Sequence, residues 1–147
     1  NALIDDALAK GARLLTGGRA NDTHMSPTLL DGVTREMRLW REESFGPVKA
    51  IIRVHSEEEA LAVANDSEYG LSAAVYSRDS ARAWNVAQRL HTGICHINGP
   101  TVHDEAQMPF GGCKASGYGR FGGRAGIAEF TELRWITIQT QPRELPF

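Results

Sequence analysis

The segment Glu42-Glu43-Ser44-Phe45-Gly46-Pro47 places a carboxylate and an aromatic ring just before a Gly-Pro turn. A carboxylate in this position can accept two hydrogen bonds from a ribose diol, and Phe45 can pack against a flat ring. The other interpretation is that Glu43 is an exposed residue at the end of a short helix. The segment alone leaves both interpretations open.

A second candidate is the glycine-rich stretch from Met108 to Arg120. Seven of the 15 glycines of the chain lie between Gly111 and Gly126. Glycine is kept where the backbone needs φ > 0 or approaches something closely. A flexible linker would lack Phe, Tyr, Met and Cys at this density, yet the stretch contains all four. We therefore predict an ordered loop that lines a site, with Phe110 embedded in it.

Four other patterns give weaker indications of function. Residues 117–122 match G-x-G-x-x-G, but dinucleotide binding requires this motif directly after a strand and at the start of a helix in a βαβ unit. Cys95 and His96 are neighbours on a predicted strand, so their side chains point to opposite faces and cannot pair as thiol and base. Cys113 has no base nearby in the sequence, which makes a redox-thiol protein remote. The histidines and cysteines lack metal-ligand spacing, so we predict no metal site.

The composition excludes several classes of protein. The 147 residues carry a net charge of −2 and are 41% hydrophobic, as expected of one soluble globular domain. No basic run favours nucleic acid, no apolar run approaches the ~20 residues that span a bilayer, and no signal peptide is present. Two cysteines form no disulfide framework, so we expect a cytoplasmic location. The first residue is Asn and the chain opens inside an apparent helix, which indicates a piece of a longer protein.

The middle of the chain alternates apolar runs with helical segments. Ser56 and Glu59 form a capping box at the start of one helix, and Asp79 caps the next. This order predicts an α/β fold with a parallel βαβαβ sheet and right-handed crossovers. Ligands of such sheets bind at the carboxyl ends of strands, where the third strand stops at Asn98 and the glycine-rich loop follows. The predicted strands are residues 48–54, 71–76 and 94–97.

The end of the chain contains one more predicted strand, residues 133–140, with bulky side chains on both faces. A strand at the end of a chain leaves an exposed edge, which invites pairing. It lies either in the sheet of its own chain or beside a strand of a neighbouring subunit, and the pattern leaves both open.

Taken together, these segments resemble the C-terminal part of the NAD(P)-dependent aldehyde dehydrogenase superfamily. The matching motifs follow the order of the family across nearly the whole chain. Residues 103–105 before Met108, and residues 130–137, resemble most the branch of salicylaldehyde and vanillin dehydrogenases. The motifs are Glu43 to Val48 (E-x-F-G-P-V), Asn65 to Leu71 (N-x-x-x-Y-G-L), Thr92 to Asn98 (T-G-x-x-x-x-N) and Pro109 to Arg120 (P-F-G-G-x-K-x-S-G-x-G-R).

The resemblance implies roles for the residues that match. Glu43 would bind the nicotinamide ribose of NAD or NADP, and Phe45 would contact the nicotinamide end. Val102, His103 and Phe110 would line a pocket for an aromatic aldehyde that carries a hydroxyl. The last strand would extend a sheet of a partner subunit in a homo-oligomer, either a dimer or a tetramer. Its contacts would be made by Leu133, Trp135, Ile136 and Ile138.

The resemblance also implies a division of the chain and of the chemistry. Residues 1–131 would belong to the catalytic domain, and residues 132–147 would form the oligomerisation strand and tail. The catalytic cysteine and general-base glutamate of the family would lie upstream of Asn1, so this chain alone would be inactive. In the intact enzyme the thiolate would attack the aldehyde, hydride would pass to NAD(P)⁺, and activated water would release the acid. The alternative is a non-catalytic module that pairs with itself or a partner through residues 133–140.

Overall fold

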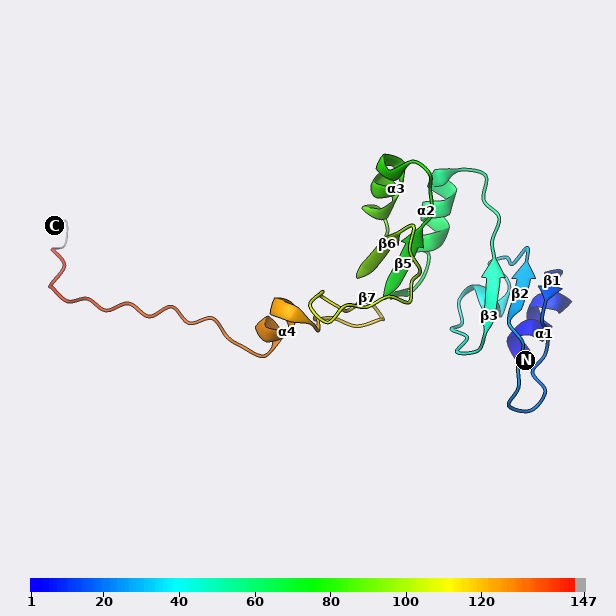
Figure 1. Ribbon diagram of the computed structural model, residues 1–147, viewed down its shortest axis with the longest axis horizontal. Coiled ribbons are helices and arrows are strands. Elements are labelled where there is room, and N and C mark those ends of the chain that lie inside the picture. The colour runs from blue at the N-terminus through cyan, green and yellow to red at the C-terminus, as the bar shows by residue number, and fades with distance from the viewer. Residues whose placement is uncertain (145–147) are drawn as a thin grey trace.

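The computed structural model describes residues 1–144 and shows two folded parts, followed by a glycine-rich loop, a short helix and an extended tail (Figure 1). The first part contains α1 (Ala2–Ala9), β1 (Arg13–Thr16), β2 (Thr28–Asp31), the 3-10 helix η1 (Arg38–Trp40) and β3 (Val48–Ile51). The remainder contains α2 (Glu57–Asn65), β4 (Tyr69–Gly70), β5 (Ser72–Val75), α3 (Ser80–Ala87), β6 (Ile94–Ile97), β7 (Cys113–Lys114) and α4 (Gly123–Glu129).

The first part is a three-stranded sheet in the order β1-β2-β3, covered by α1. β2 runs antiparallel to β1 and parallel to β3. The buried carboxylate of Asp31 accepts hydrogen bonds from Arg53 at 2.7 Å and from Arg13 at 2.9 Å, and these bonds lower the pKa of Asp31. The side chains of the core are Ile4, Ala7, Ala12, Leu30, Val33, Met37, Leu39 and Val48.

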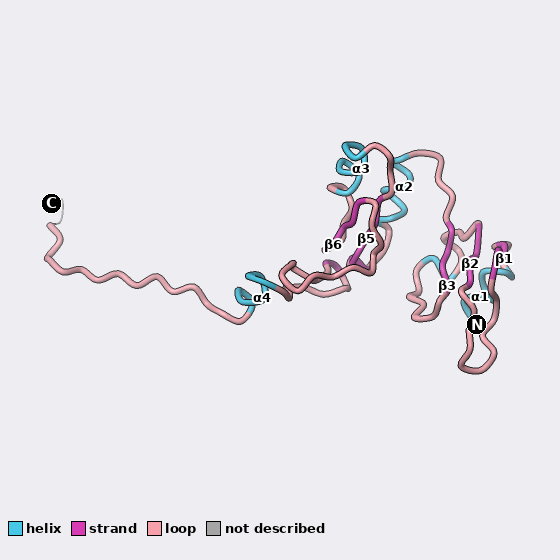
Figure 2. Tube along the Cα trace, viewed as in Figure 1, coloured by secondary structure: helices cyan, strands magenta, loops and turns pink. Residues whose placement is uncertain are grey.

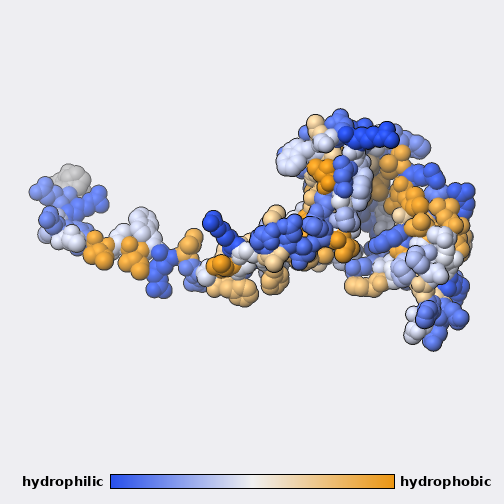
Figure 3. Space-filling view, viewed as in Figure 1, coloured by the Kyte–Doolittle hydropathy of each residue, from blue (hydrophilic) through white to orange (hydrophobic). Residues whose placement is uncertain are grey.

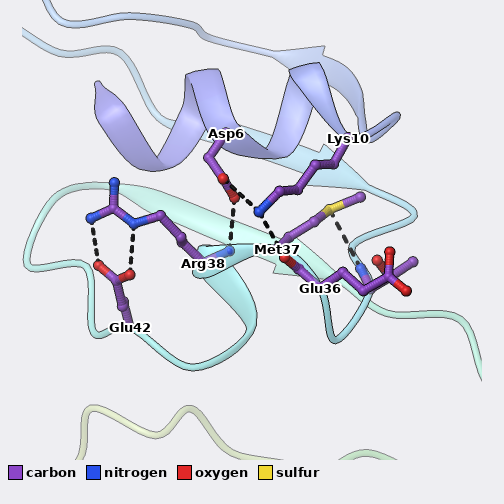
Figure 4. A network of polar contacts seen from close by, with 7 residues as sticks. Asp6, Lys10, Glu36, Met37, Arg38 and Glu42 are labelled. Carbon is purple, nitrogen blue, oxygen red and sulfur yellow. Dashed lines mark hydrogen bonds and ion pairs between the residues drawn. The ribbon is translucent and has the colours of Figure 1, made fainter.

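A polar network joins α1 to η1, as Figure 4 shows. The Asp6 carboxylate accepts a hydrogen bond from the backbone amide of Arg38 at 2.8 Å and pairs with Lys10 at 2.7 Å. The guanidinium of Arg38 then donates to both carboxylate oxygens of Glu42, at 2.6 and 2.7 Å. This bidentate pair holds the backbone immediately before Glu43 against the first part.

The second part is built on a parallel pair of strands, β5 and β6, connected through α3. The predicted caps are confirmed: Ser56 accepts from the amide of Glu59 at 3.1 Å, and Asp79 accepts from the amide of Arg82 at 3.0 Å. The Glu59 carboxylate reaches back to the amide of His55 at 2.7 Å. β6 ends at Ile97, and the next residue, Asn98, turns the backbone with a φ of +56°.

The single βαβαβ sheet is not confirmed, because its first strand pairs elsewhere. Val48–Ile51 aligns residue for residue with Thr28–Asp31 in the first part, while within residues 1–144 only β5 and β6 form a parallel βαβ unit. An apolar run predicts that a segment is a strand, but its partner depends on residues far away in the sequence. The coarser prediction of a mixed α/β structure is confirmed.

The tail after α4 is extended and pairs with no strand of the described chain (Figure 2). The predicted strand at residues 133–140 is therefore not formed here, since a strand requires hydrogen bonds from a neighbour. Its apolar side chains stand in solvent, and orange patches along the tail mark them in Figure 3. No helix within residues 1–144 has the length and apolar character to cross a membrane.

Candidate functional site

The glycine-rich loop lies directly on the backbone at the start of β6. A Cβ atom built on Gly93 would sit 1.9 Å from the carbonyl oxygen of Gly111, so the two backbones touch where only glycine fits. Phe110 and Phe121 close the loop by exchanging two backbone hydrogen bonds of 2.8 Å. The loop is ordered by these contacts and presents Phe110 beside β6.

The far end of the loop is bonded to the chain that follows α2. β7 pairs antiparallel with β4, and the amide of Gly70 donates to Ser116 Oγ at 3.0 Å. The Cys113 thiol donates to the carbonyl oxygens of Gly70 at 3.4 Å and His91 at 3.2 Å, which makes it a structural contact. The guanidinium of Arg120 donates to the carbonyls of residues 112 and 119, at 2.7 Å each.

Two hollows flank Phe110. The first, of about 350 Å³, lies between β6 and residues 103–110. The second, of about 300 Å³, is lined by Val102, His103 and Phe110 together with Leu71. The structure thus brings together the three residues assigned to the substrate pocket, and His103 and Phe110 border both hollows. The role of these residues in substrate binding stays a prediction.

The polar end of the first hollow contains two histidines. The rings of His96 and His103 meet edge to face, with their centroids 5.4 Å apart. Nε2 of His103 lies 3.3 Å from a carboxylate oxygen of Glu105. His96 was not among the candidate site residues, although its alternation with Ile94 on β6 places both on one face. Its Nε2 atom is buried and has no hydrogen-bond partner among residues 1–144.

The two cysteines are poor nucleophiles in this arrangement. Cys95 borders the first hollow, but burial raises the pKa of its thiol and disfavours the thiolate. Cys113 is held by the two carbonyl contacts described above. Within the described residues, no cluster of three or more His, Cys, Asp or Glu side chains could hold a metal ion.

The predicted cofactor residues lie on the loop between η1 and β3. Glu43 borders a third hollow, of about 420 Å³, whose other lining residues include Ser116, Leu71 and Ser72. The carboxylate of Glu43 forms no ion pair with any described residue, and Phe45 is 95% exposed. Residues 71 and 72 also border the second hollow, so the second and third hollows share lining residues at the start of β5.

These side chains fit a nicotinamide nucleotide in chemistry. A carboxylate without an ion pair suits a ribose diol, because each hydroxyl can donate to one of its oxygens. An aromatic ring that is exposed on both faces suits the flat nicotinamide. The functions of Glu43 and Phe45 rest on the sequence motif; the structure adds that both are exposed and that Glu43 borders the third hollow.

Comparison with known proteins gives consistent matches. A model of the aldehyde dehydrogenase family matches residues 1–136. The chain is 65% identical to a vanillin dehydrogenase from Pseudomonas fluorescens over 145 residues, which is 99% of this chain and 30% of that protein. It thus spans about 30% of the length of such relatives.

Solved structures agree. The crystal structure of a salicylaldehyde dehydrogenase from Pseudomonas putida G7 in complex with salicylaldehyde matches with a TM-score of 0.93 and 50% identity, over 100% of this chain and 30% of that one. A Mycobacterium tuberculosis aldehyde dehydrogenase in complex with NAD⁺ matches with a TM-score of 0.82 and 38% identity, over 89% of this chain and 28% of that one.

Proposed function

Since this chain belongs to the aldehyde dehydrogenase family, whose members use NAD⁺ or NADP⁺, we propose that it forms part of an enzyme that oxidises an aromatic aldehyde to the carboxylic acid. The observation that carries the proposal is the pair of hollows around Phe110, each with an apolar wall and with His103 at its border. The 65% identity to a vanillin dehydrogenase supports the same class of substrate.

The side chains around Phe110 support the proposal of an aromatic substrate. Phe110 offers a ring against which a second ring packs, offset or edge to face. His103 and Glu105 lie at 3.3 Å from each other beside it and offer a hydrogen-bonding group to a ring hydroxyl. An aliphatic aldehyde would leave both the apolar wall and this polar end without a partner.

We place the cofactor in the third hollow, which Glu43 borders, and the aldehyde in the hollows around Phe110. The Glu43 carboxylate would accept hydrogen bonds from the ribose that carries the nicotinamide, and Phe45 would cover the nicotinamide end. When bound, NAD(P)⁺ supplies the hydride acceptor. The Arg38–Glu42 pair holds the backbone from which Glu43 projects.

We assign nucleophilic attack and water activation to the part of the full-length enzyme that this chain does not span. The environments of Cys95 and Cys113 support this assignment, since partial burial raises the pKa of the Cys95 thiol and the Cys113 thiol is bonded to two carbonyls. In the full-length enzyme a cysteine thiolate would attack the aldehyde carbon, the adduct would lose hydride to the NAD(P)⁺ acceptor and become a thioester, and water activated by a glutamate would hydrolyse the thioester to the acid and the free thiol. This chain would supply the substrate wall and one side of the cofactor site.

We also propose that the tail pairs with another subunit of a homo-oligomer. The exposed fractions of Leu133, Trp135 and Ile138 are 105%, 90% and 84%, and that of Ile136 is 73%. Side chains alternate between the faces of an extended chain, so both faces of this tail carry large apolar groups. Pairing as a strand would cover them. A purely non-catalytic pairing module would use the same tail, but it would leave the hollows around Phe110 without a function.

The substrate class is tested by kinetics of the full-length enzyme. Burying a benzene ring against Phe110 is worth about 2 kcal/mol, so kcat/KM for benzaldehydes should exceed that for acetaldehyde by about 30-fold. The variant Phe110→Ala should lose most of this ratio while it still oxidises acetaldehyde. Equal kcat/KM for acetaldehyde and benzaldehyde in the unmodified enzyme would contradict the proposal.

The cofactor assignment is tested with Glu43→Gln. Removing the charge from two hydrogen bonds should cost about 1.5–3 kcal/mol, so the KM for NAD(P)⁺ should rise by about 10- to 100-fold. The KM for the aldehyde should stay within about twofold, since Glu43 does not border the hollows around Phe110. Glu36→Gln is the matched control, because Glu36 is exposed and borders neither the hollow beside Glu43 nor those around Phe110. Equal cofactor KM values in the two variants would show that Glu43 is only a surface residue.

A further inference from the structure

Lys114 has a backbone conformation that its residue type disfavours. Its φ is +56°, in the left-handed region that glycine adopts readily and other residues rarely do. The same loop has glycine at two other positive-φ positions, Gly117 and Gly119. A lysine at position 114 therefore indicates that its side chain does something that glycine could not.

The side chain of Lys114 caps the end of α2. Its ammonium donates to the carbonyl oxygens of Asn65 and Ser67, at 3.0 Å each, and Asn65 is the last residue of that helix. The C-terminal carbonyls of a helix lack intrahelical partners and carry partial negative charge. α2 has three glutamates in its first turn and no basic residue in its last. The complementary cation comes from a residue 49 positions beyond Asn65.

The backbone around Lys114 adds little to this anchor. β7 pairs with β4 over two residues only, with one further backbone–backbone hydrogen bond from the amide of Ala115 to the carbonyl of Glu68 at 2.8 Å. The side chains of Ser116 and Cys113 add the two bonds to Gly70 described above. Such a short pair of strands is not stable by itself. Three residues lie between Phe110 and Lys114, and one of them, Gly111, packs on the backbone of Gly93. The end of α2 thus fixes Lys114, at one end of the segment 110–114, and Phe110 lies at the other end.

We propose that Lys114 is a positioning residue for the aldehyde-binding wall. Its ammonium holds the glycine-rich loop on the end of α2 and so determines where Phe110 lies over β6. Among the described residues, those that line the hollows beside Phe110 do not include Lys114, so it acts through the loop and touches no substrate. The inference rests on the proposed function of these hollows.

The test uses Lys114→Met, Lys114→Gly and Lys114→Arg in the full-length enzyme. Displacing a substrate-positioning wall by ~1 Å can cost up to ~100-fold, so we expect the KM for an aromatic aldehyde to rise by about tenfold or more in the Met and Gly variants. The KM for NAD(P)⁺ should stay within about twofold. Lys114→Arg keeps the charge and should stay close to the unmodified enzyme. Lys49→Met is the matched control, since Lys49 is exposed on β3.

A second measurement is independent of activity. Hydrogen exchange at the amides of Phe110 and Phe121, which bond to each other's carbonyls, should be faster in Lys114→Met and Lys114→Gly than in the Lys49→Met control. If Lys114→Met does not fold, both measurements are made on Lys114→Gly alone, because glycine adopts the left-handed backbone conformation at position 114 without strain.

Three results would overturn the role of Lys114: unchanged aldehyde KM, a parallel rise of aldehyde and cofactor KM, or unchanged exchange at Phe110 and Phe121. An unmodified enzyme that does not oxidise aromatic aldehydes would instead overturn the proposed function. The exchange measurement would then still show whether Lys114 holds the loop. The two failures are therefore distinguishable.

Discussion

Replacing Gly93 with alanine is expected to displace the glycine-rich loop and to abolish most aromatic aldehyde oxidation by the full-length enzyme. The added Cβ would lie 1.9 Å from the carbonyl oxygen of Gly111, 2.8 Å from its carbonyl carbon and 2.9 Å from Cα of Gly112. All three atoms belong to the backbone, so no side-chain rotation relieves the clash. Gly93 is not among the positive-φ glycines, which leaves this contact as the source of the cost.

The size of the effect follows from overpacking. Forcing extra atoms into a packed site costs about 1–3 kcal/mol and sometimes more, and a backbone clash lies at the upper end. The loop can avoid it only by moving away from β6, which carries Phe110 with it. We therefore expect the KM for aromatic aldehydes to rise by at least about tenfold, together with a lower urea midpoint of unfolding.

Gly126→Ala is the matched control for this glycine. The nearest atom to its added Cβ, a backbone carbon of Phe121, is 3.7 Å away, and Gly126 lies within α4. Alanine there is favoured by about 1 kcal/mol through helix propensity, so stability should be unchanged or higher. An aldehyde KM in Gly93→Ala equal to that of the control would show that the loop does not depend on this contact.

The double variant Trp135→Lys/Ile138→Lys is expected to convert the full-length oligomer into monomers. One side chain is changed on each face of the tail, and burying each large apolar side chain is worth about 1.5–3 kcal/mol. Each subunit loses two, so the dissociation constant should rise by at least about a thousandfold. Sedimentation velocity over a range of protein concentrations measures this directly.

Gln141→Lys is the control for the tail, since it adds a positive charge just beyond residues 133–140 without removing an apolar group. It should leave the oligomer intact. A double variant that sediments like the unmodified protein would assign the contacts between subunits to another surface. Monomers in both variants would indicate that charge, rather than the loss of apolar burial, is responsible.

Local features of the fold could be predicted from the sequence, and strand partners could not. The caps at Ser56 and Asp79 depend on residues three positions away, so the sequence contains all that determines them. The partner of Val48–Ile51 is Thr28–Asp31, and the composition of neither segment specifies that pairing. The extended tail was predicted as a strand because composition indicates strand character even where no partner is present.

The site divides in the same way. The density of glycines and the embedded Phe110 predict an ordered loop, and the structure places that loop against β6. The contacts of Gly93 and Lys114 could not be predicted, because each joins segments far apart in the chain. The place of His96 in the site could have been predicted, because its alternation with Ile94 puts both side chains on the same face of β6. The motifs that match the aldehyde dehydrogenase family predicted the family and the candidate site residues, which local patterns alone did not. A family motif reflects residues that meet in the folded protein, whereas a local pattern reflects only neighbours in the sequence.

The separate core of the first part has a consequence for the order of folding. Its buried side chains come from residues 4–48, so this part can form its core before later residues are available. The anchor between Lys114 and Asn65 closes a loop of 49 residues, which costs about 3 kcal/mol in chain entropy. Docking of the glycine-rich segment should therefore be a late event. A molecule that fails at that step would keep its core and lack only the wall beside Phe110.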